Sequence, residues 1–478
     1  MKFLNNLKPN FDLTYNDAFL VPNKTDVNSR FDVDLTAPDK LSTIPIVVAN
    51  MTSVSGRRMA ETVTRRGGLS VLPQDAPIEV TKKIIDAIRK AHLIYDTPIT
   101  LMSDNIVSDA LNIIHKRSHG SVIIVDADNK PIGIVTEDDL QGFDRFKVLK
   151  DVMNSKVLCL EDKMSLNDMY HYLTSNRLSV APVVNKKGVL IGIMTPKACL
   201  RSEIYKPNLD ENGKLKVAVE IGVNKDVEKR AKAFIEYGVE ILVLDTAHGH
   251  QQKMIDAIKL VRKLSSKVTI VAGNIATKEG TRDLLMAGAD VIKVGIGPGA
   301  MCTTRVMTGV GRPQLSAVMD CAKEARKLGK HIWADGGIRY PRDIALAMAG
   351  GAGNVMFASW FAKTNESAGE IRFDESGRAY KESFGMASRR AVRERNQKEL
   401  SLDLAKKELF EEGISTSKFY IDPARPGVED IIDQIMAGVR SSCTYVGVNK
   451  LDKMYSKAVI GLQSSSGYQE GLPTSTNW

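Results

Sequence analysis

The segment of residues 295–305 carries the side chains best suited to covalent chemistry. Its sequence is GIGPGAMCTTR, in which three glycines surround a proline and precede Cys302. Glycine and proline let the backbone turn sharply and present carbonyls and amides at close range; carbonyls suit a cation and amides suit an anion. A thiol beside a cation such as Arg305 can have its pKa lowered towards the reactive thiolate. We therefore interpret Cys302 as a candidate nucleophile, with a small buried cysteine as the alternative.

Two aspartates end other short apolar runs. Asp335 precedes two glycines. Such a turn can bind phosphate through its amides, while the carboxylate accepts hydrogen bonds from ribose hydroxyls. Asp335 could equally cap a turn. Asp245 precedes His248 and His250, whose spacing of two lacks the further ligands of a zinc site, so we interpret them as loop histidines.

These segments follow a repeated strand–helix unit that must position them. Continuous apolar runs, typical of parallel strands covered on both faces, occur at residues 44–49, 69–72, 217–221, 241–245, 268–273, 291–295, 332–335 and 354–358. Helical patterns separate them, one of them at about residues 78–91. Eight such runs predict an α/β fold, a closed (β/α)₈ TIM barrel, with an open doubly wound sheet as the alternative. Active sites of such barrels lie on the loops after the strands, so these segments should converge there.

An internal duplication interrupts the alternation at residues 94–205. The sequence PIGIVT at residues 131–136 matches LIGIMT at residues 190–195, and the apolar runs before them also correspond. Two homologous halves can bury each other's apolar faces, which predicts one inserted module of two repeats. We therefore expect residues 1–93 and 206–478 to form the barrel and residues 94–205 the insert.

Composition restricts the classes of function. The 478 residues carry a net charge of +9 and five scattered cysteines, too few for a disulfide framework. No apolar run approaches the roughly 18 residues that span a bilayer, and the first residues lack the apolar core of a signal peptide. The basic run at residues 389–395 has no interleaved aromatic residues. We expect a cytoplasmic protein that binds phosphorylated small molecules, with no nucleic-acid or membrane partner.

Together, these motifs resemble the IMP dehydrogenase/GMP reductase family. The resemblance covers the chain from Leu13 to about Gly447 and is carried by residues 49–51, 245–250, 272–274, 295–305, 308–314 and 334–339. The duplicated insert resembles the pair of CBS repeats that this family places after the second barrel helix. The resemblance implies that Cys302 attacks C2 of a purine nucleotide. In the dehydrogenase, IMP then loses hydride to NAD and water releases XMP. In the reductase, GMP loses ammonia and NADPH delivers hydride to give IMP.

Three local features favour the reductase. Dehydrogenases carry an Arg-Tyr pair in a flap, whereas residues 388–413 contain no tyrosine. The sequences FGMAS at residues 384–388 and RSSCTYVG at residues 440–447 resemble the reductase forms. Many familiar reductases lack CBS repeats, but a bacterial group of reductases carries them. The resemblance therefore implies a GMP reductase, with IMP dehydrogenase and a non-catalytic nucleotide-sensing scaffold as alternatives.

The resemblance also implies a role for each site residue. Thr304 and Glu412 would protonate the departing ammonia, since an amide anion cannot leave unprotonated. The main-chain carbonyls of Gly297, Gly299 and Cys302 would bind a potassium ion. The residues expected to face NADPH are Asp245, Thr246, Ala247, Gly295, Ile296 and Gly297. The residues expected to hold GMP or IMP are Asn50, Met51, Ala300, Asp335, Gly336, Gly337, Ala358, Ser359, Gly385, Met386, Ala387 and Ser388.

Departures from the family pattern affect the phosphate site and the insert. Ala300 replaces the usual serine and Ala358 a common glycine. A hydroxyl is lost at position 300, so the phosphate must gain a compensating donor. In the insert, Thr136 and Asp139 match the hydroxyl and carboxylate that hold a nucleotide ribose in CBS repeats, whereas the second repeat has Thr195 but Ala198 in place of the aspartate. We expect ATP and GTP to bind mainly through the first repeat. The family further suggests a homotetramer or an octamer.

Overall fold

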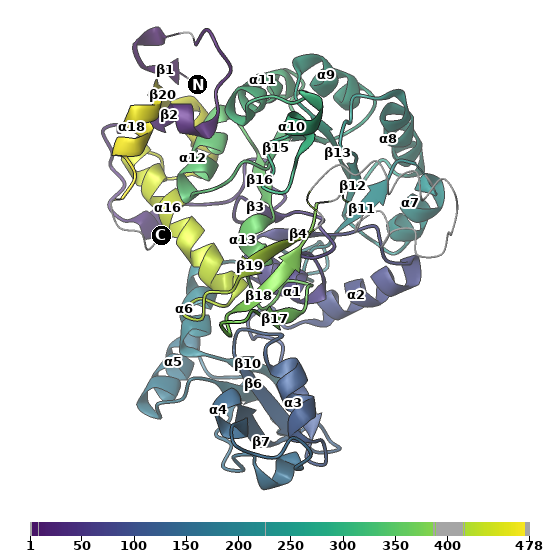
Figure 1. The fold of residues 1–478 in the computed structure, drawn as a ribbon, viewed down its shortest axis with the longest axis vertical. Coiled ribbons are helices and arrows are strands. Elements are labelled where there is room, and N and C mark those ends of the chain that lie inside the picture. The colour runs from purple at the N-terminus through teal and green to yellow at the C-terminus, as the bar shows by residue number, and fades with distance from the viewer. Residues whose placement is uncertain are drawn as a thin grey trace.

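The computed structural model describes residues 2–7, 9–224, 226–385, 388, 414 and 416–473. At its centre lies a closed barrel of parallel strands (Figure 1). Around the barrel the order is β11 (Ala218–Gly222), β12 (Ile241–Asp245), β13 (Thr269–Ile275), β14 (Val291–Val294), β15 (His331–Asp335), β16 (Asn354–Phe357), β3 (Ile46–Val48) and β4 (Leu69–Leu72). Each of the apolar runs expected to be a strand forms one of these, so the predicted (β/α)₈ barrel is confirmed.

Alternate residues of the strands pack in two apolar layers. One set, which includes Val243, Val291 and Trp333, meets inside the barrel. The other set packs against the surrounding helices. Trp333 is fully buried and its indole N–H donates to Asp39 Oδ2 at 2.7 Å, which satisfies the polar edge of the largest side chain in the interior.

Helices surround the barrel or lie in the loops at the ends of its strands. They are α1 (Arg57–Arg65), α2 (Ile78–Lys90), α7 (Val227–Glu236), α8 (Gln252–Leu264), α9 (Lys278–Met286), α10 (Thr304–Thr308), α11 (Gln314–Lys327), α12 (Pro341–Gly350), α13 (Ser359–Ala362), α16 (Val428–Val446), α17 (Met454–Lys457) and α18 (Ser465–Glu470). The 19-residue α16 packs along α12 and α1. In the part of the chain that the structure describes, no helix is both long and apolar enough to cross a bilayer.

Two small sheets outside the barrel join segments that are distant in sequence. One sheet contains β1 (Lys2–Phe3), β2 (Ala18–Leu20) and β20 (Val459–Leu462), and so ties the N-terminal segment to the C-terminal region. The other contains β17 (Ile371–Phe373), β18 (Ala379–Ser383) and β19 (Ser417–Tyr420).

The insert contains two sheets of identical topology, below the barrel in Figure 1. In the first, β5 (Thr100–Met102) lies parallel to β6 (Ser121–Val125), and β7 (Pro131–Thr136) runs antiparallel to β6. In the second, β8 (Leu160–Glu161), β9 (Ala181–Val184) and β10 (Leu190–Met194) repeat this arrangement. Side chains of both sheets share one apolar cluster. The helices of this region are α3 (Val107–Ile114), α4 (Glu137–Leu140), α5 (Leu166–Ser175) and α6 (Pro196–Ile204).

Buried ion pairs fix the entry of the insert to the barrel. Arg65 of α1 contacts Asp96 at 3.0 Å, and Arg117 of the insert contacts both Asp96, at 3.4 Å, and Glu61 of α1. Burial opposes ionisation of Asp96, but the two arginines outweigh it and lower its pKa to about 2. Because these charges are paired with one another, the network holds the insert in one orientation on α1.

A second set of ion pairs fixes the exit of the insert. Arg201 of α6 contacts Glu429 at 3.1 Å, Asp430 at 2.6 Å and Asp433 at 2.8 Å, all on α16. The insert is therefore held to the barrel at both chain crossings.

Candidate active site

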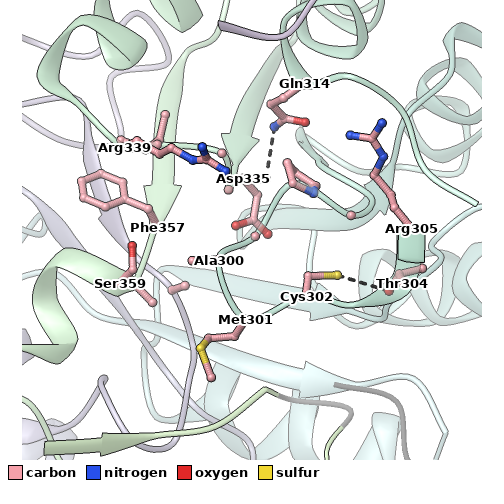
Figure 2. Close-up of a pocket in the computed structure, with 18 of the residues that line it drawn as sticks. Ala300, Met301, Cys302, Thr304, Arg305, Gln314, Asp335, Arg339, Phe357 and Ser359 are labelled. Atoms are coloured by element: carbon pink, nitrogen blue, oxygen red, sulfur yellow. Dashed lines mark hydrogen bonds between the residues drawn. The ribbon is translucent and has the colours of Figure 1, made fainter. Parts of the chain in front are cut away.

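A pocket of about 690 Å³ opens where the barrel strands end (Figure 2). It is lined by loops that follow β3, β12, β14, β15 and β16, as expected for the active face of a (β/α)₈ barrel. The sequence-predicted residues that line it are Met51, Ala247, Gly297, Gly299, Ala300, Cys302, Thr304, Asp335, Gly336, Gly337, Ala358, Ser359 and Gly385.

The loop after β14 presents Cys302 to this pocket. Its thiol donates a hydrogen bond to the hydroxyl of Thr304 at 3.2 Å (Figure 2), and its backbone N–H donates to the Gly299 carbonyl at 3.0 Å. Gly297 has a φ of +88°, and a Cβ there would lie 2.3 Å from Cγ of Arg305, so the turn requires glycine. The guanidinium of Arg305 points away from the thiol in Figure 2. The hydroxyl of Thr304, rather than the cation expected from the sequence, is therefore the polar neighbour of the thiol.

The other cysteines lie in environments that suppress thiolate formation. Cys199, Cys321 and Cys443 are buried, and burial raises their pKa values to about 11, 12 and 12. Cys159 is half-buried in the insert, and burial raises its pKa as well. Cys302 is the one exposed cysteine of the five, all of which lie in the described residues.

Polar side chains converge where β12, β14 and β15 end. Lys293 Nζ lies 2.6 Å from Asp335 Oδ2 and 3.0 Å from Asp245 Oδ1. Asn50 donates to Asp245 Oδ2 at 2.8 Å, and Asn274 donates to Asp335 Oδ2 at 2.9 Å and to the Gly295 carbonyl at 2.7 Å. Asp335 lines the pocket, whereas Asn50, Asp245, Thr246, Gly295 and Ile296 lie outside its lining.

Glycine turns build the wall opposite the cysteine loop. Gly336 and Gly337 have φ values of +86° and +80°, and a Cβ on Gly336 would lie 3.1 Å from the backbone N of Gly299. The two loops therefore approach each other closely, and the Gly336 N–H donates to the Met356 carbonyl at 3.0 Å. Ser359, the first residue of α13, and Arg339 also line this wall, and Arg339 extends towards the pocket in Figure 2.

Sequence reasoning missed some lining residues. Thr14, Tyr15 and Asn16 reach the pocket from the N-terminal segment. Gln314, buried at the start of α11, donates from Nε2 to the Val294 carbonyl at 2.9 Å and to the Asp335 carbonyl at 3.1 Å. It thus ties together the ends of β14 and β15, the strands that carry the cysteine loop and Asp335. The sequence signal for Gln314 was the RPQ motif at residues 312–314. That motif does not show which strands the Gln314 side chain joins.

Several predicted residues lie away from the pocket or beyond the described residues. Met386, Ala387 and Glu412 lie outside the described residues. Ser388 is buried but does not line the pocket. In the insert, Thr136 donates to Asp139 Oδ2 at 2.8 Å and caps α4, while Thr195 accepts from the backbone N of Ala198 at 3.0 Å and caps α6.

An exposed cysteine follows the sixth barrel strand and lies, with the glycine turns after the seventh, in the pocket at the active face of a (β/α)₈ barrel, which is the architecture of a barrel enzyme. The model of the IMP dehydrogenase / GMP reductase domain matches residues 12–474, and the chain belongs to this family. It is therefore an oxidoreductase.

The chain is similar over its whole length to curated members of the family. It is 51% identical over 479 residues to GMP reductase of Mycobacterium tuberculosis (strain H37Rv), with 100% of both chains covered. It is 37% identical over 472 residues to inosine-5'-monophosphate dehydrogenase of Staphylococcus aureus (strain NCTC 8325), with 96% of this chain and 95% of that one covered. A crystal structure of a cysteine-to-alanine variant of GMP reductase from Trypanosoma brucei, in complex with GMP, matches with a TM-score of 0.68 and 29% identity. That match covers 99% of this chain and 100% of the other.

Proposed function

We propose that the chain is a GMP reductase, which converts GMP, NADPH and two protons to IMP, ammonium and NADP⁺. The observation that carries the proposal is the 51% identity to a GMP reductase over the whole chain, against 37% to an IMP dehydrogenase. The pocket supports it, because an exposed thiol with a hydroxyl partner lies in a space large enough for a nucleotide.

The first half of the proposed reaction is a substitution at C2 of GMP. Cys302 Sγ forms a bond to C2 as its proton moves to the hydroxyl of Thr304, 3.2 Å away, which gives up its own proton in turn towards the departing amino group. The C2–N2 bond then breaks, and its electron pair leaves with the amino group, which must be protonated to depart as ammonia. Thr304 is placed to pass a proton on, and Glu412 is the expected partner in that transfer.

The second half returns the enzyme to its starting state. NADPH, when bound, would supply the hydride that C2 accepts. The C2–S bond would then break with its electron pair on Cys302 Sγ, which takes up a proton as IMP is released. We propose that NADPH lies beside Ala247, with Asp245, Thr246, Gly295, Ile296 and Gly297 nearby. Ala247 and Gly297 both line the pocket beside the cysteine loop, which supports this placement.

The turn of the cysteine loop suits a potassium ion. We propose that the main-chain carbonyls of Gly297, Gly299 and Cys302 bind it. The positive φ of Gly297 supports the site, and the Gly299 carbonyl, which accepts the Cys302 N–H, keeps a second lone pair for a cation. The ion would hold the loop that presents the thiol.

For the nucleotide, we propose that Asp335 accepts hydrogen bonds from the ribose and that Gly336, Gly337, Ser359 and Arg339 hold the phosphate. Arg339 would supply the donor that is lost where Ala300 replaces the family's serine. Met51, Gly385, Met386, Ala387 and Ser388 would surround the base.

We also propose that residues 94–205 are a regulatory pair of CBS repeats between the two parts of the catalytic barrel, residues 1–93 and 206–478. The identical topology of its two sheets supports this assignment. ATP and GTP would bind mainly through Thr136 and Asp139 and alter the rate or the assembly of a homotetramer or octamer.

Asp139→Ala is expected to raise the ATP or GTP concentration needed for that effect by about 10- to 100-fold, the effect of losing a charged hydrogen-bond acceptor. The measurement is the rate of GMP reduction, together with sedimentation, at increasing nucleotide concentration. Asp168→Ala is the matched control, because Asp168 accepts from Ser165 at 2.7 Å in a similar cap of the second repeat. If ATP and GTP change neither rate nor assembly of the unmodified protein, the regulatory proposal is wrong.

The function itself is tested by product analysis. With GMP and NADPH, the protein is expected to release IMP and ammonium in equal amounts as NADPH is consumed. Release of XMP from IMP and NAD, without reduction of GMP, would instead assign the dehydrogenase activity.

A further inference from the structure

Lys293 is a charged side chain inside the barrel, where most side chains are apolar. Lys293 alternates along β14 with Val291, and Val291 belongs to the apolar cluster inside the barrel. By the same alternation, Asp245 follows Val243 on β12 and Asp335 follows Trp333 on β15, both members of that cluster. The three charged side chains therefore form the layer between the apolar interior and the pocket.

The barrel is built to admit this lysine. Lys293 is only 2% exposed. Gly273 is its neighbour on β13, and a Cβ there would lie 2.6 Å from Cβ of Lys293 and 2.4 Å from its carbonyl oxygen. Any larger residue at position 273 would displace β14. A buried ammonium is costly to maintain unless it is paired, so its contacts should account for its presence.

Those contacts are the two aspartates of the site. Lys293 Nζ bridges Asp335 at 2.6 Å and Asp245 at 3.0 Å. Burial disfavours the charged lysine, but the two carboxylates outweigh it and raise the pKa of Lys293 well above its usual range. Without the Lys293 ammonium, the two carboxylates that it bridges would repel each other, and one of them would take up a proton.

The bridge also determines which oxygen of Asp335 remains available. Oδ2 of Asp335 accepts from both Lys293 and Asn274, whereas Asp245 has both oxygens engaged, by Lys293 and Asn50. Within the described residues, no hydrogen bond reaches Asp335 Oδ1, and Asp335 is the carboxylate of the pair that lines the pocket.

We infer that Lys293 is a positioning residue of the active site, whose ammonium holds Asp245 and Asp335 side by side and turns the free oxygen of Asp335 towards the nucleotide ribose. The inference rests on the proposed function only in taking a purine nucleotide as the ligand. Lys293 acts on the nucleotide through Asp335 and does not contact it directly.

Among the residues that the structure describes, few charged groups face Lys293. Asp245 and Asp335 contact it from β12 and β15, and Asn50 and Asn274 complete the layer with neutral amides. Glu220, on β11, is a further acidic side chain of the interior and accepts from Gln74 Nε2 at 2.7 Å. The pH response of the layer is therefore expected to come from the aspartate pair.

The test is the Kd of GMP, measured by titration on the full chain between about pH 5.5 and 8.5, which spans the titration range of a carboxylate pair with raised pKa. Lys293→Met is expected to weaken binding by about 10- to 100-fold at the acidic end. The loss should shrink as pH rises, because the unpaired carboxylates then ionise. Each Kd is divided by that of the unmodified protein at the same pH, so that titration of the phosphate cancels.

Three further variants separate positioning from packing. Lys293→Arg keeps the charge and is expected to retain most of the binding. Lys330→Met is the matched control, because Lys330 pairs with Asp290, just before β14, at 2.7 Å. This variant should bind GMP normally. The double variant Lys293→Met with Asp245→Asn leaves a single carboxylate, so it is expected to fold and to bind GMP better than Lys293→Met alone.

Any of three results would overturn the inference. Lys293→Met could bind GMP normally at every pH. Its loss of binding could be independent of pH. The double variant could fold no better and bind no better than the single variant. The proposed function fails separately, through the absence of GMP reduction by the unmodified protein, because the binding titration requires no turnover.

Discussion

Cys302→Ala is expected to lower the rate of GMP reduction on the order of 10⁴-fold or more, as removal of a catalytic nucleophile does in other covalent enzymes. The physical reason is that Cys302 is the one thiol among the described residues that line the pocket, and the hydroxyls there are weaker nucleophiles. The thiol contacts the Thr304 hydroxyl and otherwise packs loosely, so its loss should leave GMP bound. The measurement is the consumption of NADPH, with a parallel titration of GMP binding.

A remote thiol provides the control for Cys302→Ala. Cys159 is half-buried in the insert, so Cys159→Ala should leave the rate unchanged. If Cys302→Ala kept a rate within about tenfold of the unmodified protein, covalent catalysis by this cysteine would be wrong.

Thr304→Val is expected to lower the same rate by about 10²- to 10⁴-fold, the usual contribution of a group that transfers protons. Valine preserves the shape of threonine but removes the hydroxyl that accepts the thiol proton at 3.2 Å. Thr304→Ser restores the hydroxyl and should restore most of the rate. The measurement is kcat and KM for GMP, with the loss expected in kcat.

Thr308→Val is the matched control for this prediction. Thr308 lies on the same short helix, but its hydroxyl donates to the Thr304 carbonyl at 2.7 Å rather than to the thiol. A similar loss of kcat in both variants would show that the helix, and not the Thr304 hydroxyl, supports catalysis.

The barrel could be predicted from the sequence because parallel strands buried on both faces leave a strong pattern. Continuous apolar runs such as residues 241–245 and 291–295 became β12 and β14 almost unchanged. The converging loops followed from the fold, since active groups collect where barrel strands end. Cys302 could be singled out in advance for the same reason.

Contacts between distant segments could not be predicted in this way. Residues 2–3 pair with residues 459–460. Residues 14–16, which belong to the same N-terminal segment, line the pocket. Gln314 has an ordinary polar side chain whose importance lies in the two carbonyls it joins. Lys293 did leave a signal, a lysine within a buried strand, but only the barrel geometry shows that two aspartates face it.

The insert shows the same limit at the level of single residues. Its duplication was visible in the sequence, and the two sheets indeed share one topology. Thr136 and Asp139, however, form a helix cap with each other. A cap and a ribose-binding pair require the same residue types at the same spacing, so the sequence pattern alone does not separate them.

The most direct measurement compares both reactions of the family on one preparation. Initial rates are followed through nicotinamide absorbance, first with GMP and NADPH and then with IMP and NAD. We predict rapid consumption of NADPH with GMP, abolished by Cys302→Ala, and little formation of NADH from IMP. Rapid NADH formation from IMP with no consumption of NADPH would contradict the assignment.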